Sequence, residues 1–202
     1  ENIELEGVTV EGGYADGTYT NDSYTESESS GAGMYLNDSN ALLREVTFRD
    51  NYSIKYGGGL RSRISYVEIF GCHFLNNRAD DEGGGINFSN HTMWIENSRF
   101  EDNSSALAGG GGRGYTSTPT TIRNTSFLDN ASEVEGGGFY VASAANLEHV
   151  IVIGNSAPTG AGLSIISSAA TLTNCTVVGN EGFGISTRNS PTLKNTVVAL
   201  NE

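Results

Sequence analysis

The sequence predicts an all-β protein, a right-handed single-stranded parallel β-helix (a solenoid) with about eight rungs and three short strands in each rung. Three observations predict this fold: a repeat of fixed period, alternation of apolar and polar residues within each repeat, and paired glycines in most repeats. The repeats close on asparagines spaced 21 to 27 residues apart: Asn51, Asn77, Asn103, Asn130, Asn155, Asn180 and Asn201. A period of this length is typical of one structural unit stacked many times.

Each repeat contains three short segments in which apolar and polar residues alternate, which is the periodicity of strands. The first segment follows the glycines, as in 34–36 and 139–141. The second has Leu or Ile eight residues before the closing asparagine, and the third has Phe or Val three residues before it. Equivalent segments of successive repeats are expected to pair in parallel at about 4.8 Å. The coil is taken as right-handed because parallel crossovers almost always are.

The asparagines and glycines are predicted to form the bends between strands. Asparagine tolerates the left-handed backbone region and bonds to nearby backbone groups. Stacked amide side chains can also bond from one repeat to the next. Glycine triplets such as 57–59 indicate positive φ or a close approach of neighbouring backbone. Both columns are therefore assigned to the scaffold, and no GK[ST] motif supports a phosphate-binding loop.

Composition and charge exclude some classes of function. Asp and Glu outnumber Lys and Arg by 24 to 11, for a formal net charge of −13. This balance argues against nucleic acid as a partner, because phosphate binding needs a basic face. No apolar run approaches membrane-spanning length, so no membrane insertion is expected of this segment. A hydrophobic fraction of 37% suits a solenoid, in which each rung contributes only its inward positions.

The two cysteines are predicted to be buried free thiols. Cys72 and Cys175 occupy the same inward column, four repeats apart. At the spacing of parallel strands that separation is about 19 Å. A disulfide requires Cα atoms within about 7 Å, so we expect both residues to act as small apolar core side chains.

Residues 1–202 are expected to form a single domain, with one inserted loop at 13–30. This loop is rich in tyrosine and carboxylates, and both a partner-binding loop and a flexible one fit its composition. No polar cap is visible at either end, so we expect the chain to be part of a longer protein. Open strand edges favour end-to-end or lateral self-assembly. The chain also has N-x-[ST] sequons, which permit glycosylation in a secreted protein. They begin at Asn21, Asn37, Asn51, Asn90, Asn103, Asn124, Asn130 and Asn174.

The pairing of an F-x-x-N motif with G-G-x-(Ile/Leu) identifies a resemblance. The motifs stand at 48–51, 74–77, 100–103 and 127–130, with the glycine motif at 58–60 and 84–86. These residues resemble the repeats of the polymorphic outer-membrane proteins of chlamydiae and related bacterial surface proteins. Pectate-lyase-like β-helices are also similar. The resemblance covers almost the whole chain, although the last three repeats have Val for Phe. It implies a β-helix exposed at the cell surface and involved in adhesion.

The outward positions of the first strand are the candidate ligand-binding residues. They are Tyr35, Arg61, Arg63, Asn87, Arg113, Tyr115 and Tyr140. Aromatic rings can stack on sugar rings, and a guanidinium can bind a carboxylate with two hydrogen bonds. In pectate-lyase-like enzymes the corresponding face lines the substrate groove. The alternative, which we favour, is an ordinary solvated strand face on which a few arginines balance the acidic charge.

Two sets of charged residues have structural alternatives. Asp80, Asp81 and Glu82 are candidate calcium ligands, since hard cations take several carboxylate oxygens. Plain surface acidity is the preferred interpretation of these residues. On the second strand Glu96, Arg123 and Glu148 alternate in sign from one repeat to the next, which is best explained by a cross-strand charge ladder.

These features favour a non-catalytic extracellular or cell-surface segment of an adhesin, surface-layer or filament protein. The alternative is a carbohydrate-active β-helix: a polysaccharide lyase, an epimerase or a module that binds acidic glycans. The alternative ranks second because short turns leave a substrate groove without walls. The expected partners are a polysaccharide or another surface protein.

Overall fold

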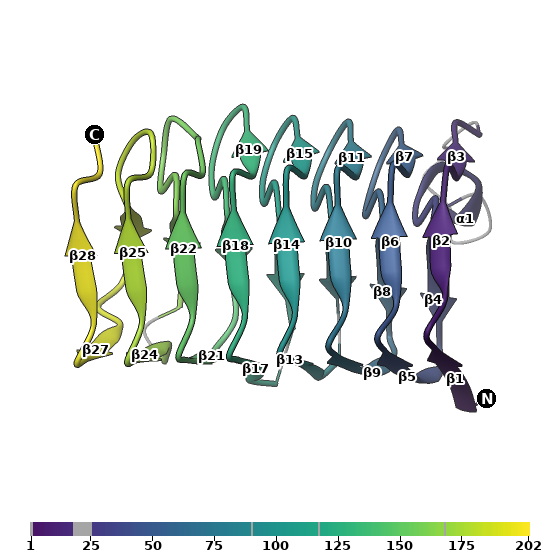
Figure 1. Ribbon diagram of the computed structural model, residues 1–202, viewed down its shortest axis with the longest axis horizontal. Coiled ribbons are helices and arrows are strands. Elements are labelled where there is room, and N and C mark those ends of the chain that lie inside the picture. The colour runs from purple at the N-terminus through teal and green to yellow at the C-terminus, as the bar shows by residue number, and fades with distance from the viewer. Residues whose placement is uncertain (1, 18–25, 90, 117, 168) are drawn as a thin grey trace.

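The computed structural model describes residues 2–17, 26–89, 91–116, 118–167 and 169–202, and it is a parallel β-solenoid. Figure 1 shows the rungs side by side, with the N-terminus at one end and the C-terminus at the other. All the strand pairs are parallel, as in the pairing of Phe48 with Phe74 and of Phe74 with Phe100. Residues 18–25 of the predicted inserted loop lie outside the described residues, and its described part includes a short helix, α1 (Glu26–Ser29).

The strands form four sheets, which we number in the order in which the chain visits them. Sheet 1 contains β1 (Asn2–Glu6), β5 (Asn40–Arg44), β9 (Tyr66–Phe70), β13 (Met93–Glu96), β17 (Thr120–Arg123), β21 (Ala145–Glu148), β24 (Thr171–Thr173) and β27 (Thr192–Lys194). Sheet 2 contains β2 (Thr9–Glu11), β6 (Thr47–Arg49), β10 (His73–Leu75), β14 (Arg99–Glu101), β18 (Ser126–Leu128), β22 (Ile151–Ile153), β25 (Thr176–Val178) and β28 (Val197–Ala199).

Sheets 3 and 4 complete each rung. Sheet 3 contains β3 (Tyr14–Ala15), β7 (Tyr52–Ser53), β11 (Arg78–Ala79), β15 (Ser104–Ser105) and β19 (Ala131–Ser132). Sheet 4 contains β4 (Met34–Asn37), β8 (Leu60–Arg63), β12 (Ile86–Ser89), β16 (Gly112–Tyr115), β20 (Phe139–Val141), β23 (Leu163–Ile165) and β26 (Ile185–Thr187). The prediction of three strands per rung was therefore wrong for the rungs that contribute to sheet 3, because these rungs have a fourth strand. Strands of two residues are too short to show alternation in a sequence.

The core consists of inward columns stacked from rung to rung. The Leu/Ile column of sheet 1 is fully buried through the middle of the solenoid, as at Ile69 and Ile95. In sheet 2 the rings of Phe74 and Phe100 stack with centroids 4.6 Å apart and planes within 1° of parallel. Buried residues of the same type thus stack on one another from rung to rung. Burial of these large apolar side chains provides the main stabilisation.

The closing asparagines form a continuous buried ladder at the start of sheet 3. In the middle of it the Asn77 amide donates to the Asn103 side-chain oxygen at 3.0 Å, and Asn103 donates to Asn130 at 2.9 Å. The same amides cap strand carbonyls, as where Asn103 donates to the Phe74 oxygen at 2.9 Å. The predicted bonding of amides along the stack is confirmed.

The left-handed residues are not the ladder asparagines, and our assignment of positive φ to them was wrong. Positive φ occurs one residue earlier, at Asp50 (55°), Asn76 (51°), Asp102 (54°) and Asp129 (53°). Asp and Asn are the non-glycine residues that most readily adopt this region. This backbone requirement explains why Asp or Asn recurs at this position of the repeat.

The glycine triplets serve both expected purposes. Gly83 has a φ of +68°, which turns the chain into sheet 4. A Cβ atom on Gly84 would lie 2.3 Å from the Ser104 carbonyl oxygen. Glycine is therefore required here, because backbone from the next rung occupies the space that any side chain would fill.

Both cysteines are free and buried, as predicted. The Cys72 thiol lies 3.5 Å from the carbonyl oxygens of Leu43 and Phe70. Burial raises the pKa of Cys72 to about 11 and also raises the pKa of Cys175.

The native protein is therefore expected to resist thiol reagents. At pH 8 a raised pKa leaves little thiolate, and the thiolate is the reactive form. Titration with an aromatic disulfide reagent should show almost no reaction before denaturation and two equivalents of thiol in 6 M guanidinium. Rapid reaction of one equivalent in the folded protein would contradict the buried position.

Candidate functional site

The structure brings all seven predicted ligand-binding residues together on sheet 4. Tyr35, Arg61, Asn87, Arg113 and Tyr140 are register partners on five successive strands. The parallel row two residues further along contains Arg63 and Tyr115. The predicted residues therefore form two adjacent rows across one sheet.

The first row is largely buried by its own neighbours. The exposed fraction is 6% for Arg61 and 1% for Asn87. Arg61 Nη1 donates to Asn87 Oδ1 at 2.7 Å and to Ser89 Oγ at 3.1 Å. The Arg61 guanidinium also lies 5.2 Å from the ring centre of Tyr56, which comes just before the glycines that lead into the same strand. Arg61 is thus engaged by the scaffold on several sides.

The next arginine of the row forms an ion pair. Arg113 Nη1 lies 3.0 Å from Glu82 Oε2, and its guanidinium lies 5.6 Å from the ring centre of Tyr140. Burial raises the pKa of Glu82, and the charge of Arg113 opposes that rise. Burial likewise raises the pKa of Tyr140, with a further contribution from the Glu135 carboxylate. Tyr115 in the second row is more open, with 55% of its surface exposed.

The three candidate calcium ligands point to different partners. Asp80 accepts a hydrogen bond from the Tyr52 hydroxyl at 2.5 Å, and this bond raises the pKa of Tyr52 to about 12. Asp81 pairs with Lys55 at 2.8 Å, and Glu82 pairs with Arg113. Among the described residues, no group of three His, Cys, Asp or Glu side chains is arranged to hold a metal ion.

A second face, on sheet 1, was not selected as a site from the sequence. The Tyr66 hydroxyl donates to Glu68 at 2.5 Å, and Trp94 Nε1 donates to Glu96 at 3.1 Å. Glu68 and Trp94 are register partners on β9 and β13. The sequence does contain a signal for this face. In adjacent repeats an aromatic residue stands two positions before a carboxylate.

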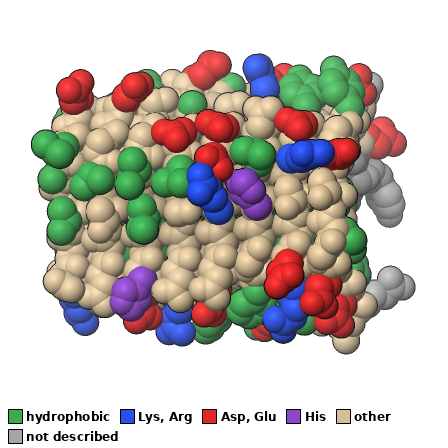
Figure 2. All heavy atoms as spheres, in the orientation of Figure 1, with side chains coloured by type: hydrophobic (Ala, Val, Ile, Leu, Met, Phe, Trp, Pro, Cys, Tyr) green, Lys and Arg blue, Asp and Glu red, His purple; other side chains and the backbone are tan. Residues whose placement is uncertain are grey.

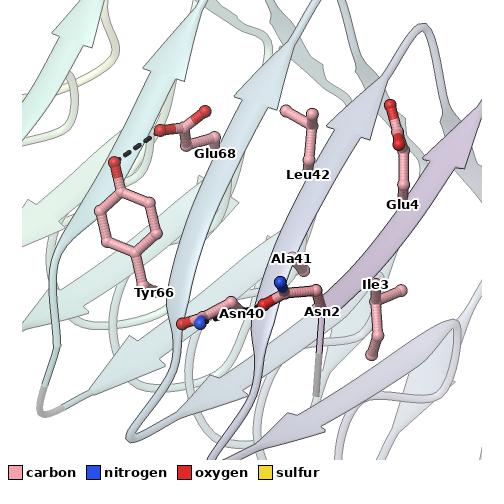
Figure 3. A pocket seen from close by; sticks show the side chains of 8 residues that line it. All are labelled: Asn2, Ile3, Glu4, Asn40, Ala41, Leu42, Tyr66 and Glu68. Carbon is pink, nitrogen blue, oxygen red and sulfur yellow. Dashed lines mark hydrogen bonds between the residues drawn. The ribbon is translucent and has the colours of Figure 1, made fainter.

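Two hollows adjoin Tyr66 on that face. The first, of about 350 Å³, is shown in Figure 3. It is lined by Asn2, Ile3, Glu4, Asn40, Ala41, Leu42, Tyr66 and Glu68. The second, of about 420 Å³, is lined by Asp38, Ser39, Asn40, Ile64, Tyr66 and His91. Both volumes are within the range of small-ligand sites.

The comparison with known families agrees with the coiled architecture. A family described as "Right handed beta helix region" matches residues 71–201, well over half of the chain. The chain belongs to the right-handed β-helix family. Comparisons with curated proteins and with solved structures found no match. Family membership confirms the fold and is compatible with both surface proteins and carbohydrate-active proteins.

The β-helix also has an apolar patch over the C-terminal half of sheet 2, which Figure 2 shows from the front. Ile151, Ile153 and Val197 are exposed there by 45%, 39% and 55%. The N-terminal half of the same sheet carries ion pairs instead, such as Arg99 with Glu101. Among the described residues, no helix has the length and apolar character needed to cross a membrane.

The glycosylation sequons of the β-helix are of two kinds, according to whether their asparagine lies in the buried ladder. Asn51, Asn103 and Asn130 are buried in the ladder, with at most 1% of their surface exposed. Asn37 and Asn124 are exposed. Of these five described sequons, only those at Asn37 and Asn124 have an amide that a glycan can occupy in the folded protein.

Proposed function

We propose that this chain is a non-catalytic segment of an extracellular or cell-surface protein, in which the β-helix acts as a rigid, acidic rod. The observation that carries the proposal is the bonding of the sheet 4 arginines. Arg61 is held by Asn87 and Ser89, and Arg113 is held by Glu82. In an enzyme, such arginines would bind a polyanionic substrate. Here they are bound to side chains of neighbouring rungs.

The ladders support a mechanical function for this rod. Successive rungs are joined by main-chain bonds and by the asparagine ladder. The rungs with Phe in sheet 2 are also joined by stacked rings, as between Phe48 and Phe74 at 4.9 Å. A solenoid of this kind holds its ends at a set distance and displays its faces in a regular array. The apolar patch on sheet 2 offers a surface for lateral contact with another surface protein or a second copy of the chain.

Product analysis tests the proposal. The purified chain is incubated with acidic and neutral polysaccharides, and shorter products are sought by chromatography and by ultraviolet absorbance of unsaturated sugars. We expect no product from any polymer. Turnover that disappears in an Arg113→Ala variant would refute the non-catalytic assignment. Antibody labelling of intact source cells tests location, and exclusive labelling after lysis would refute the surface assignment.

A second candidate function, action on or binding of acidic glycans, rests on Glu82. This carboxyl group has a raised pKa and lies beside Arg113 in the predicted row. Perturbed carboxyls next to cations are frequent at functional sites. In the same experiment this alternative predicts turnover or retention of polygalacturonate, lost when Glu82→Gln breaks the arrangement.

A further inference from the structure

The outward face of sheet 1 carries a strip of aromatic and carboxylate side chains that the rod function does not use. Its members alternate along β9 and β13, where Glu68 faces Trp94 and Phe70 faces Glu96 across the strands. All four are partly buried and lie in neighbouring rungs, at the spacing of parallel strands, about 4.8 Å. With Tyr66, we call this set the sheet 1 strip.

Beside this strip lies the hollow of Figure 3, where Leu42 lies between Glu4 and Glu68. Asn2, Asn40 and Tyr66 form one row across the strands, and Glu4, Leu42 and Glu68 form the next. The Asn40 amide donates to Asn2 Oδ1 at 3.2 Å. Amide donors, carboxylate acceptors, a phenol and an aliphatic side chain therefore border one space.

We propose that the sheet 1 strip and its hollow bind an uncharged oligosaccharide that lies across the strands, with one sugar in the hollow beside Tyr66 and the next toward Trp94. Sugar rings present C–H faces to aromatic rings and hydroxyls at their edges, so they need both kinds of surface at once. Hydroxyls donate and accept, and they match a border with amides and a phenol in one row and carboxylates in the next.

Charge distinguishes this ligand from an acidic glycan. Two carboxylates, Glu4 and Glu68, line the hollow of Figure 3, and no Lys or Arg is among its lining residues. An acidic sugar there would place like charges together without compensation, which costs binding energy. The formal net charge of −13 adds a long-range repulsion to the same ligands.

A cationic ligand is disfavoured by two arginines that already lie over the rings of the strip. The Arg44 guanidinium lies 5.0 Å from the ring centre of Phe70, and the Arg123 guanidinium lies 5.1 Å from that of Trp94. Arg123 is itself held by Glu148 at 3.1 Å. A second cation near these rings would be repelled by the guanidinium already there, whereas an uncharged sugar would experience no such repulsion.

The strip contains its own reporter, because Trp94 is the only tryptophan in the chain. We would titrate the purified chain with cellohexaose, laminarihexaose and mannohexaose, and separately with hexagalacturonate, while recording tryptophan emission. We expect a saturable change in emission with at least one neutral hexasaccharide and a smaller response or none with hexagalacturonate.

Variants locate the binding. Tyr66→Ala should weaken the affinity for the neutral sugar by about tenfold, the value of one aromatic contact. Leu42→Arg should abolish binding, because the longer side chain fills the hollow. The new cation would lie between Glu4 and Glu68, whose carboxylates compensate its charge. Phe183→Ala is the matched control, since Phe183 is 72% exposed and outside the strip, and it should bind as the wild type does.

Several results would overturn this inference. They are an unchanged emission with every neutral probe, wild-type affinity in Tyr66→Ala and Leu42→Arg, or binding of hexagalacturonate alone. Circular dichroism of each variant shows whether the β-helix has formed, and Leu42→Arg provides an independent test if Tyr66→Ala does not fold. Binding here requires no turnover, so a failure of this site is measured separately from a failure of the rod function.

Discussion

Replacing Asn103 by alanine is expected to lower the free energy of unfolding by about 4 kcal/mol, because at least two buried polar groups would lose a partner at about 1–3 kcal/mol each. Asn103 is fully buried in the middle of the ladder. Its side-chain oxygen accepts bonds from the Asn77 backbone and side chain, both at 3.0 Å. Its amide donates to the Phe74 carbonyl and to Asn130, both at 2.9 Å. Urea denaturation followed by circular dichroism measures the loss.

A matched substitution tests whether the loss of stability is specific to the ladder or follows from removing any asparagine. Asn146 is exposed on sheet 1 and accepts one side-chain bond, from Thr171 at 3.0 Å. Asn146→Ala should change stability by less than about 0.5 kcal/mol, as surface substitutions usually do. Equal losses in the two variants would mean that the ladder contributes no special stability.

Replacing Phe100 by alanine is expected to cost about 3–5 kcal/mol, which is the usual range for removing a buried phenylalanine. Phe100 is fully buried, and its ring stacks between Phe74 at 4.6 Å and Phe127 at 4.9 Å. The cavity would lie between rungs whose separation is set by main-chain bonds, so the neighbours have little freedom to close it. Hydrogen exchange should show the largest loss of protection in β10, β14 and β18.

Two comparisons check the origin of this loss. Phe100→Leu keeps most of the volume and should cost much less than the alanine variant. Phe183→Ala removes a ring that is 72% exposed and should leave the unfolding midpoint almost unchanged. If Phe100→Ala unfolded at the wild-type urea concentration, the stacked rings would not be a main source of stability.

The repeat could be predicted from the sequence because a solenoid places equivalent residues in equivalent environments. Phe74 and Phe100 are in register in the sequence and in contact in the structure. The free cysteines followed from the same register, since Cys72 and Cys175 are four rungs apart. Sheet 3 was missed because two-residue strands such as β11 carry no periodic signal.

Local sequence also misplaced the left-handed residues. Asparagine was given positive φ for its intrinsic tolerance, yet Asn77 and Asn103 are ladder residues, and the preceding Asn76 and Asp102 make the turn. Both columns are rich in Asn or Asp, so residue type alone could not separate them. Burial decides between them: Asn77 and Asn103 point inward and are fully buried, whereas Asn76 and Asp102 are exposed.

The sequence by itself determined the class of fold, the inward columns and the absence of a disulfide, because these depend on spacing along the chain. Only the tertiary structure decided which outward residues are accessible. The sheet 4 arginines looked exposed by alternation, but the segment before the glycines covers them, and Arg61 retains 6% exposure. Tyr66 and Trp94 lie instead on a sheet 1 face with open hollows beside it. Accessibility depends on how turns fold back over a sheet. The alternation of apolar and polar residues along a strand does not reveal that packing.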